Sequence, residues 1–158
     1  MNKSGSRLQA LGFGKSLNPE AESLTPEARS LEPATKSKFP KKRRLLRHAD
    51  FERVYKQGRR HFAAHMTVFY LRRSLDEGEG RPGLRVGFTV GRVLGGSVQR
   101  NRMKRRLREA VRLSGFPPQV SADVVINPKR SLLAADFSEV RNQVARAFQV
   151  IEKAAKSV

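Results

Sequence analysis

Residues 91–112, GRVLGGSVQRNRMKRRLREAVR, constrain the fold more than any other stretch of this 158-residue chain. On a helical wheel of about 100° per residue, three apolar side chains fall within about 80° of Met103. They are Leu107, Ala110 and Val111. Gly95 and Gly96 permit a tight turn into this segment because glycine lacks a Cβ atom. We therefore predict a helix over residues 100–112 with one buried stripe.

The other side of this predicted helix is strongly basic. Its polar side chains are Asn101, Lys104, Arg105, Arg108 and Arg112, and the apolar stripe is flanked by Arg100 and Arg106. Glu109 is the one acid in residues 100–112, so little charge pairing offsets the repulsion. Guanidinium groups outnumber ammonium groups, which favours phosphate recognition. A solvated surface helix is the competing interpretation, and the pattern favours nucleic acid.

The sequence RNRMKRRLRE, preceded by GRVLGGSV, closely resembles the RNR motif of the protein subunit of bacterial ribonuclease P. The matching positions are Arg100, Asn101, Arg102, Lys104, Arg105 and Arg108. The resemblance implies that these residues bind the catalytic RNA of that enzyme. Family members commonly carry a Lys-Lys pair before the motif, where this chain has Arg92 and Val93, so one cation is kept and one is lost.

The net charge of +19 is unevenly distributed along the chain. Residues 1–38 hold six basic and four acidic residues, whereas residues 39–158 hold 27 basic and 10 acidic ones. The first segment is rich in Ser, Pro, Gly and Ala without a sustained period, and we expect a disordered extension there. The remaining residues, 39–158, are expected to form one RNA-binding domain.

A short helix is predicted over residues 49–57, ended by Gly58. Phe51 and Tyr55 are four residues apart and share one helical face, so they can be core residues or stacking platforms for single-stranded RNA. The pattern alone leaves this choice open. The resemblance favours a cleft for the 5′ leader of precursor tRNA, because DFERVY matches the family helix whose aromatic side chains line that cleft.

Strands are predicted over residues 66–72 and 84–90, joined as a hairpin through residues 76–83. In the first strand, Tyr70 projects to the same side as Met66 and Val68. If the preceding helix covers that side, Tyr70 completes the leader-binding cleft with the two helical aromatic residues. The expected cationic rim of this cleft consists of Arg43, Arg44, Arg47 and Arg92.

The C-terminal third predicts an apolar central strand over residues 123–127 and a helix over residues 137–154. A weaker strand is expected near residues 59–63. The fold class is therefore α+β, a two-layer sandwich in αβββαβα order. The resemblance implies a ribonuclease P protein-like fold, similar to the second domain of ribosomal protein S5, with a left-handed βαβ crossover. General rules alone would predict the right-handed form.

The chain offers no recognisable catalytic centre of its own. It has no cysteine, and no Ser–His–Asp, phosphate-loop or zinc pattern. A metal cluster of His48, His61 and His65 is conceivable. A structural or RNA-contacting role is favoured, because the glycine before His61 and His65 and the strand after them make a helical ligand pair unlikely. By resemblance, catalysis belongs to the RNA subunit, which binds Mg²⁺, and no cofactor is held by the protein alone.

The resemblance implies one function and leaves two rivals. The complete enzyme hydrolyses precursor tRNA, leaving a 5′ phosphate on the tRNA, and the protein binds the catalytic RNA and precursor tRNA; no protein partner is implied. The rivals are a ribosomal-type RNA-binding module and a DNA-binding protein with residues 100–112 in the major groove, although no helix-turn-helix partner precedes that helix. No apolar run approaches the roughly 18 residues of a membrane span, and a cytoplasmic location is expected.

Overall fold

Three helices and a four-stranded sheet make up the part of the chain that the computed structural model describes, residues 38–74 and 83–157. In chain order they are α3 (His48–Gln57), β1 (Arg59–Phe62), β2 (Met66–Arg72), β3 (Leu84–Phe88), α4 (Ser97–Ser114), β4 (Ala122–Pro128) and α5 (Phe137–Lys156). This confirms the predicted order of elements, including the weak strand β1. The predicted disorder of the N-terminal extension concerns residues outside the described part.

The sheet has the strand order β1-β2-β4-β3. Strand β4 pairs antiparallel with β2 and parallel with β3, which places the apolar strand inside the sheet as predicted. The predicted hairpin between β2 and β3 is wrong, because β4 lies between them; residues 75–82 of their connection lie outside the described residues. A strand that is apolar on both faces is best buried between two neighbours, and this burial decides the pairing.

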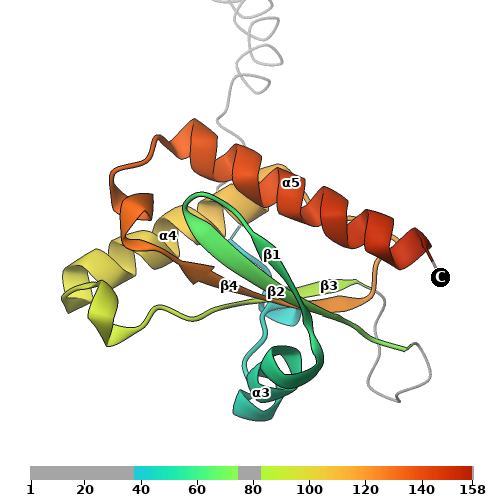
Figure 1. Ribbon diagram of the computed structural model, residues 1–158. Coiled ribbons are helices and arrows are strands. Elements are labelled where there is room, and N and C mark those ends of the chain that lie inside the picture. The colour runs from blue at the N-terminus through green and yellow to red at the C-terminus, as the bar shows by residue number, and fades with distance from the viewer. Residues whose placement is uncertain (1–37, 75–82, 158) are drawn as a thin grey trace, which may run out of the picture. The chain divides into compact units, whose positions relative to one another are not determined.

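Helices α4 and α5 cover one face of the sheet, and α3 lies on the other (Figure 1). The main core lies between the sheet and the α4–α5 layer. Its residues from α4 are Met103, Leu107, Ala110 and Val111, and those from α5 are Val140, Val144, Ala147, Phe148 and Ile151. All nine are buried, which confirms both predicted helical stripes.

The face that carries α3 has a smaller core and stays half-open. Leu45, Val54 and Val125 are buried there, while the aromatic rings and Leu71 around them are only partly buried. Gly58 ends α3 as predicted, but its φ of −77° is one that any residue adopts. A Cβ atom at Gly58 would lie 2.3 Å from the carbonyl oxygen of Val54, so close backbone approach is what requires glycine.

A buried ion-pair network ties α3 to the sheet. The Asp123 carboxylate on β4 is 1% exposed and accepts hydrogen bonds from Arg85 Nε and Nη2 at 2.7 and 2.6 Å. Arg73 Nε lies 3.1 Å from the same carboxylate, and Arg85 Nη1 lies 3.5 Å from the carboxylate of Asp50 on α3. The network therefore joins β3, β4 and the first turn of α3.

None of the described helices is both long and apolar enough to cross a membrane.

Candidate nucleic-acid interface

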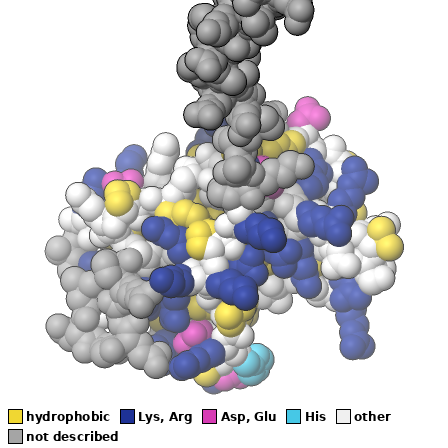
Figure 2. Space-filling model, turned by 180° about the vertical axis from the view of Figure 1, so that it is seen from behind, with side chains coloured by type: hydrophobic (Ala, Val, Ile, Leu, Met, Phe, Trp, Pro, Cys, Tyr) yellow, Lys and Arg dark blue, Asp and Glu magenta, His cyan; other side chains and the backbone are white. Residues whose placement is uncertain are grey.

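Helix α4 presents most of the predicted motif residues to solvent. Asn101, Arg102, Arg105 and Arg108 are exposed, and Arg100 and Lys104 are half-buried. Within the described residues, no hydrogen bond or ion pair engages the guanidinium groups of Arg102, Arg105 or Arg108. Figure 2 shows Lys and Arg side chains gathered across one side of the molecule, with few acidic side chains among them. The motif therefore supplies several free cations on one rigid helix.

Two further arginines of α4 have partners within the protein. Arg106 donates hydrogen bonds to the carbonyl oxygens of Leu132, Leu133 and Ala135, which fixes the turn before α5 on α4. Arg112 Nε donates to the Glu109 carboxylate at 2.9 Å, and this hydrogen bond raises the pKa of the Arg112 guanidinium. Neither belongs to the RNR match, so the fold and the free cationic surface use different arginines.

The entry to α4 depends on a glycine with an unusual backbone. Gly95 has a φ of 133°, a value that side-chain-bearing residues rarely adopt. A Cβ atom there would also lie 1.8 Å from Gln99 Oε1. The prediction of a tight turn into the motif helix is confirmed, and Gly95 is the residue that makes it.

The half-open side of the sheet carries a row of aromatic rings, Phe51, Tyr55, Phe69 and Phe62, which we call the aromatic face. The rings of Tyr55 and Phe69 meet edge to face at 4.9 Å. The Arg60 guanidinium lies 5.3 Å from the centre of the Phe69 ring. Phe62 is 69% exposed and pairs with Thr67, two residues from Phe69 on the same side of β2. This surface combines aromatic rings with a cation, as single-stranded RNA binding requires.

Tyr55 and Phe51 are held on the aromatic face by specific contacts. The Tyr55 hydroxyl lies 2.9 Å from both Asn127 Oδ1 and Thr89 Oγ1, so it can donate to the amide oxygen and accept from the threonine. The Phe51 ring lies against Gly87 of β3, where a Cβ atom would come within 2.5 Å of it. The choice between core and surface thus has a mixed answer, because both rings are partly buried and partly accessible.

The predicted place of Tyr70 in this cleft is wrong. Tyr70 is 6% exposed and belongs to the core beneath α4 and α5, on the side opposite Phe51 and Tyr55. The neighbouring residue Phe69 occupies the position in the cleft that the sequence predicted for Tyr70. Alternation along a strand turns neighbouring side chains to opposite faces, and the sequence did not show which face α3 covers. Phe69, Phe62 and Arg60 were therefore missed.

The four predicted rim arginines fall into two groups. Arg43 and Arg44 are half-buried: the Arg43 guanidinium lies 4.5 Å from the Phe116 ring centre, and Arg44 donates to the Phe39 carbonyl oxygen at 2.8 Å. Arg47 and Arg92 are exposed. A cavity of about 170 Å³ lies beside this segment, and its lining includes Phe51 together with two motif residues, Lys104 and Arg108. It joins the aromatic face to α4.

The three histidines do not converge. His65 is bound by Ser131 Oγ at 2.8 Å and by the Glu139 carboxylate at 3.1 Å, and His48 lies 3.7 Å from Glu52 on its own helix. Over the described residues, no three His, Cys, Asp or Glu side chains are grouped so that they could hold a metal ion.

Comparisons with known proteins agree with the motif. The Ribonuclease P family model matches residues 39–152. The chain is 41% identical over 92 residues to the ribonuclease P protein component of Maridesulfovibrio salexigens, covering 58% of this chain and 71% of that protein. With its counterpart in Acidothermus cellulolyticus it shares 39% over 109 residues, covering 68% and 86%. The solved ribonuclease P protein of Thermotoga maritima aligns with a TM-score of 0.57 and 25% identity, covering 68% of this chain and 96% of that one.

Proposed function

Because the chain belongs to the ribonuclease P protein family and is the protein subunit of an endoribonuclease that matures tRNA 5′ ends, we propose that its two surfaces bind two different RNAs. The motif face, which is the exposed side of α4 with Asn101, Arg102, Arg105 and Arg108, binds the catalytic RNA. The aromatic face binds the single-stranded 5′ leader of precursor tRNA.

The free guanidinium groups of Arg102, Arg105 and Arg108 support the first half of the proposal. They project from one rigid helix and have no partner within the described residues. A folded catalytic RNA presents its phosphates at fixed positions, and planar guanidinium forks recognise phosphates well. The motif face therefore suits a structured RNA.

The contact between Tyr55 and Phe69 carries the second half of the proposal. Two partly accessible rings at 4.9 Å, with Arg60 over one of them, offer stacking and a phosphate contact in one place. Bases in a duplex are already stacked on each other, so this surface suits an unpaired strand. A precursor tRNA has such a strand in its leader, and a mature tRNA lacks it.

The hydrolytic chemistry is assigned to the RNA subunit, with Mg²⁺ bound mainly by that RNA and none held by this chain alone. The protein lowers the Mg²⁺ concentration that cleavage needs, because its cations neutralise phosphates that the ions would otherwise screen. Adding the protein to the catalytic RNA at low Mg²⁺ should restore leader removal. A cytoplasmic location, where precursor tRNA is processed, completes the proposal.

Two variants at one position test the leader assignment. Tyr55→Ala and Tyr55→Phe both lose the hydroxyl contact to Asn127, but only Tyr55→Ala loses the ring. Tyr55→Ala should weaken precursor tRNA binding roughly tenfold more than Tyr55→Phe does, since stacking on a ring contributes about 1–3 kcal/mol per base. Mature tRNA and catalytic RNA should bind both variants alike. Equal losses for precursor and mature tRNA would contradict the proposal, and melting temperatures would show whether Tyr55 acts through stability alone.

A further inference from the structure

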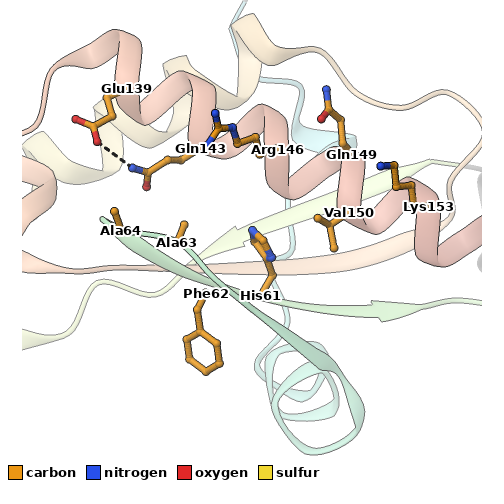
Figure 3. A pocket seen from close by; sticks show the side chains of 10 residues that line it. All are labelled: His61, Phe62, Ala63, Ala64, Glu139, Gln143, Arg146, Gln149, Val150 and Lys153. Atoms are coloured by element: carbon orange, nitrogen blue, oxygen red, sulfur yellow. Dashed lines mark hydrogen bonds between the residues drawn. The ribbon is translucent and has the colours of Figure 1, made fainter.

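A cavity of about 540 Å³ lies between strand β1 and helix α5, and Phe62 is the one residue of the aromatic face in its lining (Figure 3). Its strand wall is the segment from His61 to Ala64, and its helix wall runs from Glu139 to Lys153. The volume falls within the range of about 300–1,000 Å³ that is typical of small-molecule sites. Strand β1 is an edge strand, so the cavity opens beside the margin of the sheet.

Four polar side chains that line this cavity have no polar partner among the described residues: His61, Arg146, Gln149 and Lys153. Arg146, Gln149 and Lys153 are spaced by three and four residues, so they project from one side of α5. The acid of the cavity, Glu139, is engaged by His65 and Gln143. The site therefore keeps two free cations and two further hydrogen-bonding groups, the His61 imidazole and the Gln149 amide, with Val150 and Ala63 as its apolar wall.

This chemistry suits one nucleotide of an RNA strand. The two cations are complementary to a phosphate, and the Gln149 amide can both donate and accept hydrogen bonds, as recognition of a base edge requires. The apolar wall can contact the flat face of a base. A neutral or cationic ligand would leave Arg146 and Lys153 uncompensated.

The arrangement of β1 connects the cavity to the aromatic face. His61 points into the cavity, whereas its neighbour Phe62 points to the opposite side of the strand (Figure 3). The aromatic row crosses the sheet from Phe51 of α3, whose ring lies against Gly87 of β3, through Phe69 on β2 to Phe62 on β1. An RNA strand that follows this row reaches the edge of the sheet at β1 and can pass over it.

We propose that the β1–α5 cavity binds a nucleotide of the precursor tRNA leader at the point where the leader has crossed the aromatic face and passed the edge of β1. This inference rests on the leader assignment proposed above. Because the catalytic RNA docks on α4, leader nucleotides near the cleavage site lie at the Phe51 end and those farther toward the 5′ end lie at β1. The crossing spans three strand spacings, about 15 Å.

The test uses the full-length protein assembled with catalytic RNA and precursor tRNAs whose leaders are shortened one nucleotide at a time. The Arg146→Gln/Lys153→Gln double variant is compared with Arg141→Gln/Lys156→Gln, which removes the same charge from α5 at residues that do not line the cavity. The cavity variant should lose roughly tenfold in affinity for long leaders, with a salt slope lower by about 0.7 for each lost contact. Short leaders that end on the aromatic face should bind both variants equally.

Two results would overturn the inference. The first is that the two double variants have the same affinity at every leader length. The second is that the cavity variant loses as much affinity for short leaders and for mature tRNA as it does for long leaders. Phe69→Leu, measured in the same series, separates this inference from the proposed function. If Phe69→Leu weakens leader binding while the cavity variant does not, the aromatic face stands and the cavity assignment fails. Thermal melts followed by circular dichroism would show whether each variant is folded under the conditions of the binding measurements.

Discussion

The two faces of the sheet use the same strands for opposite purposes. On β2 and β4, the side chains toward α4 and α5 are buried, as Val68, Tyr70 and Val124 illustrate. The side chains between them point toward α3, where Phe69 and Asn127 stay partly accessible. Two long helices seal the first face, while one ten-residue helix covers only part of the second. The two faces of the sheet thus differ in how much helix covers them.

The comparison also shows where charge is hidden. The face toward α3 contains the buried carboxylate Asp123, whose contacts with Arg85 and Arg73 hold the open face together. Removing it would take away the buried carboxylate that both guanidinium groups contact, and Arg73, which is 12% exposed, would lose its ion pair. Asp123→Ala should therefore cost about 3–5 kcal/mol of unfolding free energy. Urea titration would measure this. Glu52→Gln, an exposed acid on α3, is the control and should stay within about 0.5 kcal/mol.

A second pair of variants compares the sealed and open faces directly. Leu107→Ala removes a fully buried side chain beneath α4 and should cost about 2–5 kcal/mol. Phe62→Ala removes a larger side chain that is 69% exposed, and it should change stability by no more than about 0.5 kcal/mol. Chemical denaturation of both variants tests the contrast. Similar costs would mean that Phe62 is a core residue and that the aromatic face is shorter than proposed.

Helix α4 allows a smaller effect to be measured between its own two sides. Arg105→Ala should leave stability unchanged and lower the salt slope of catalytic RNA binding by about one unit. Arg106→Ala should lower stability and leave the salt slope unchanged. It leaves three carbonyl oxygens without their donor, while the motif face stays intact. Binding isotherms at several salt concentrations, with melts of each variant, would test this. An unchanged slope in Arg105→Ala and Arg108→Ala would make the motif face ordinary solvated surface.

The helices were predictable because their signals are long and periodic. The apolar stripe from Met103 to Val111 repeats with the helical period. The stripe of α5 does the same with five buried side chains between Val140 and Ile151. The RNR match adds an ordered set of residues that a generic basic run lacks. The buried position of β4 was likewise readable from its apolar residues.

The parts that could not be predicted depend on contacts between distant residues. Strand β2 is apolar on both sides, so nothing in its sequence says which side α3 covers, and the cleft was assigned to Tyr70 instead of Phe69. Arg43 and Arg44 look like a phosphate-binding rim, but they contact Phe116 and Phe39. The pairing of β3 with β4 instead of β2 is also a long-range choice, which no local pattern determines.

The most direct measurement compares two neighbouring residues of β2 with the same substitution. Phe69→Leu and Tyr70→Leu each remove one aromatic ring, the first from the open face and the second from the core. The affinities of the assembled enzyme for precursor and mature tRNA would be measured for each variant. We predict that Phe69→Leu reduces the preference for precursor tRNA by roughly tenfold, while Tyr70→Leu lowers the melting temperature and leaves that preference intact. An unchanged preference in Phe69→Leu, or a loss in Tyr70→Leu alone, would contradict the assignment of the leader to the face that carries α3.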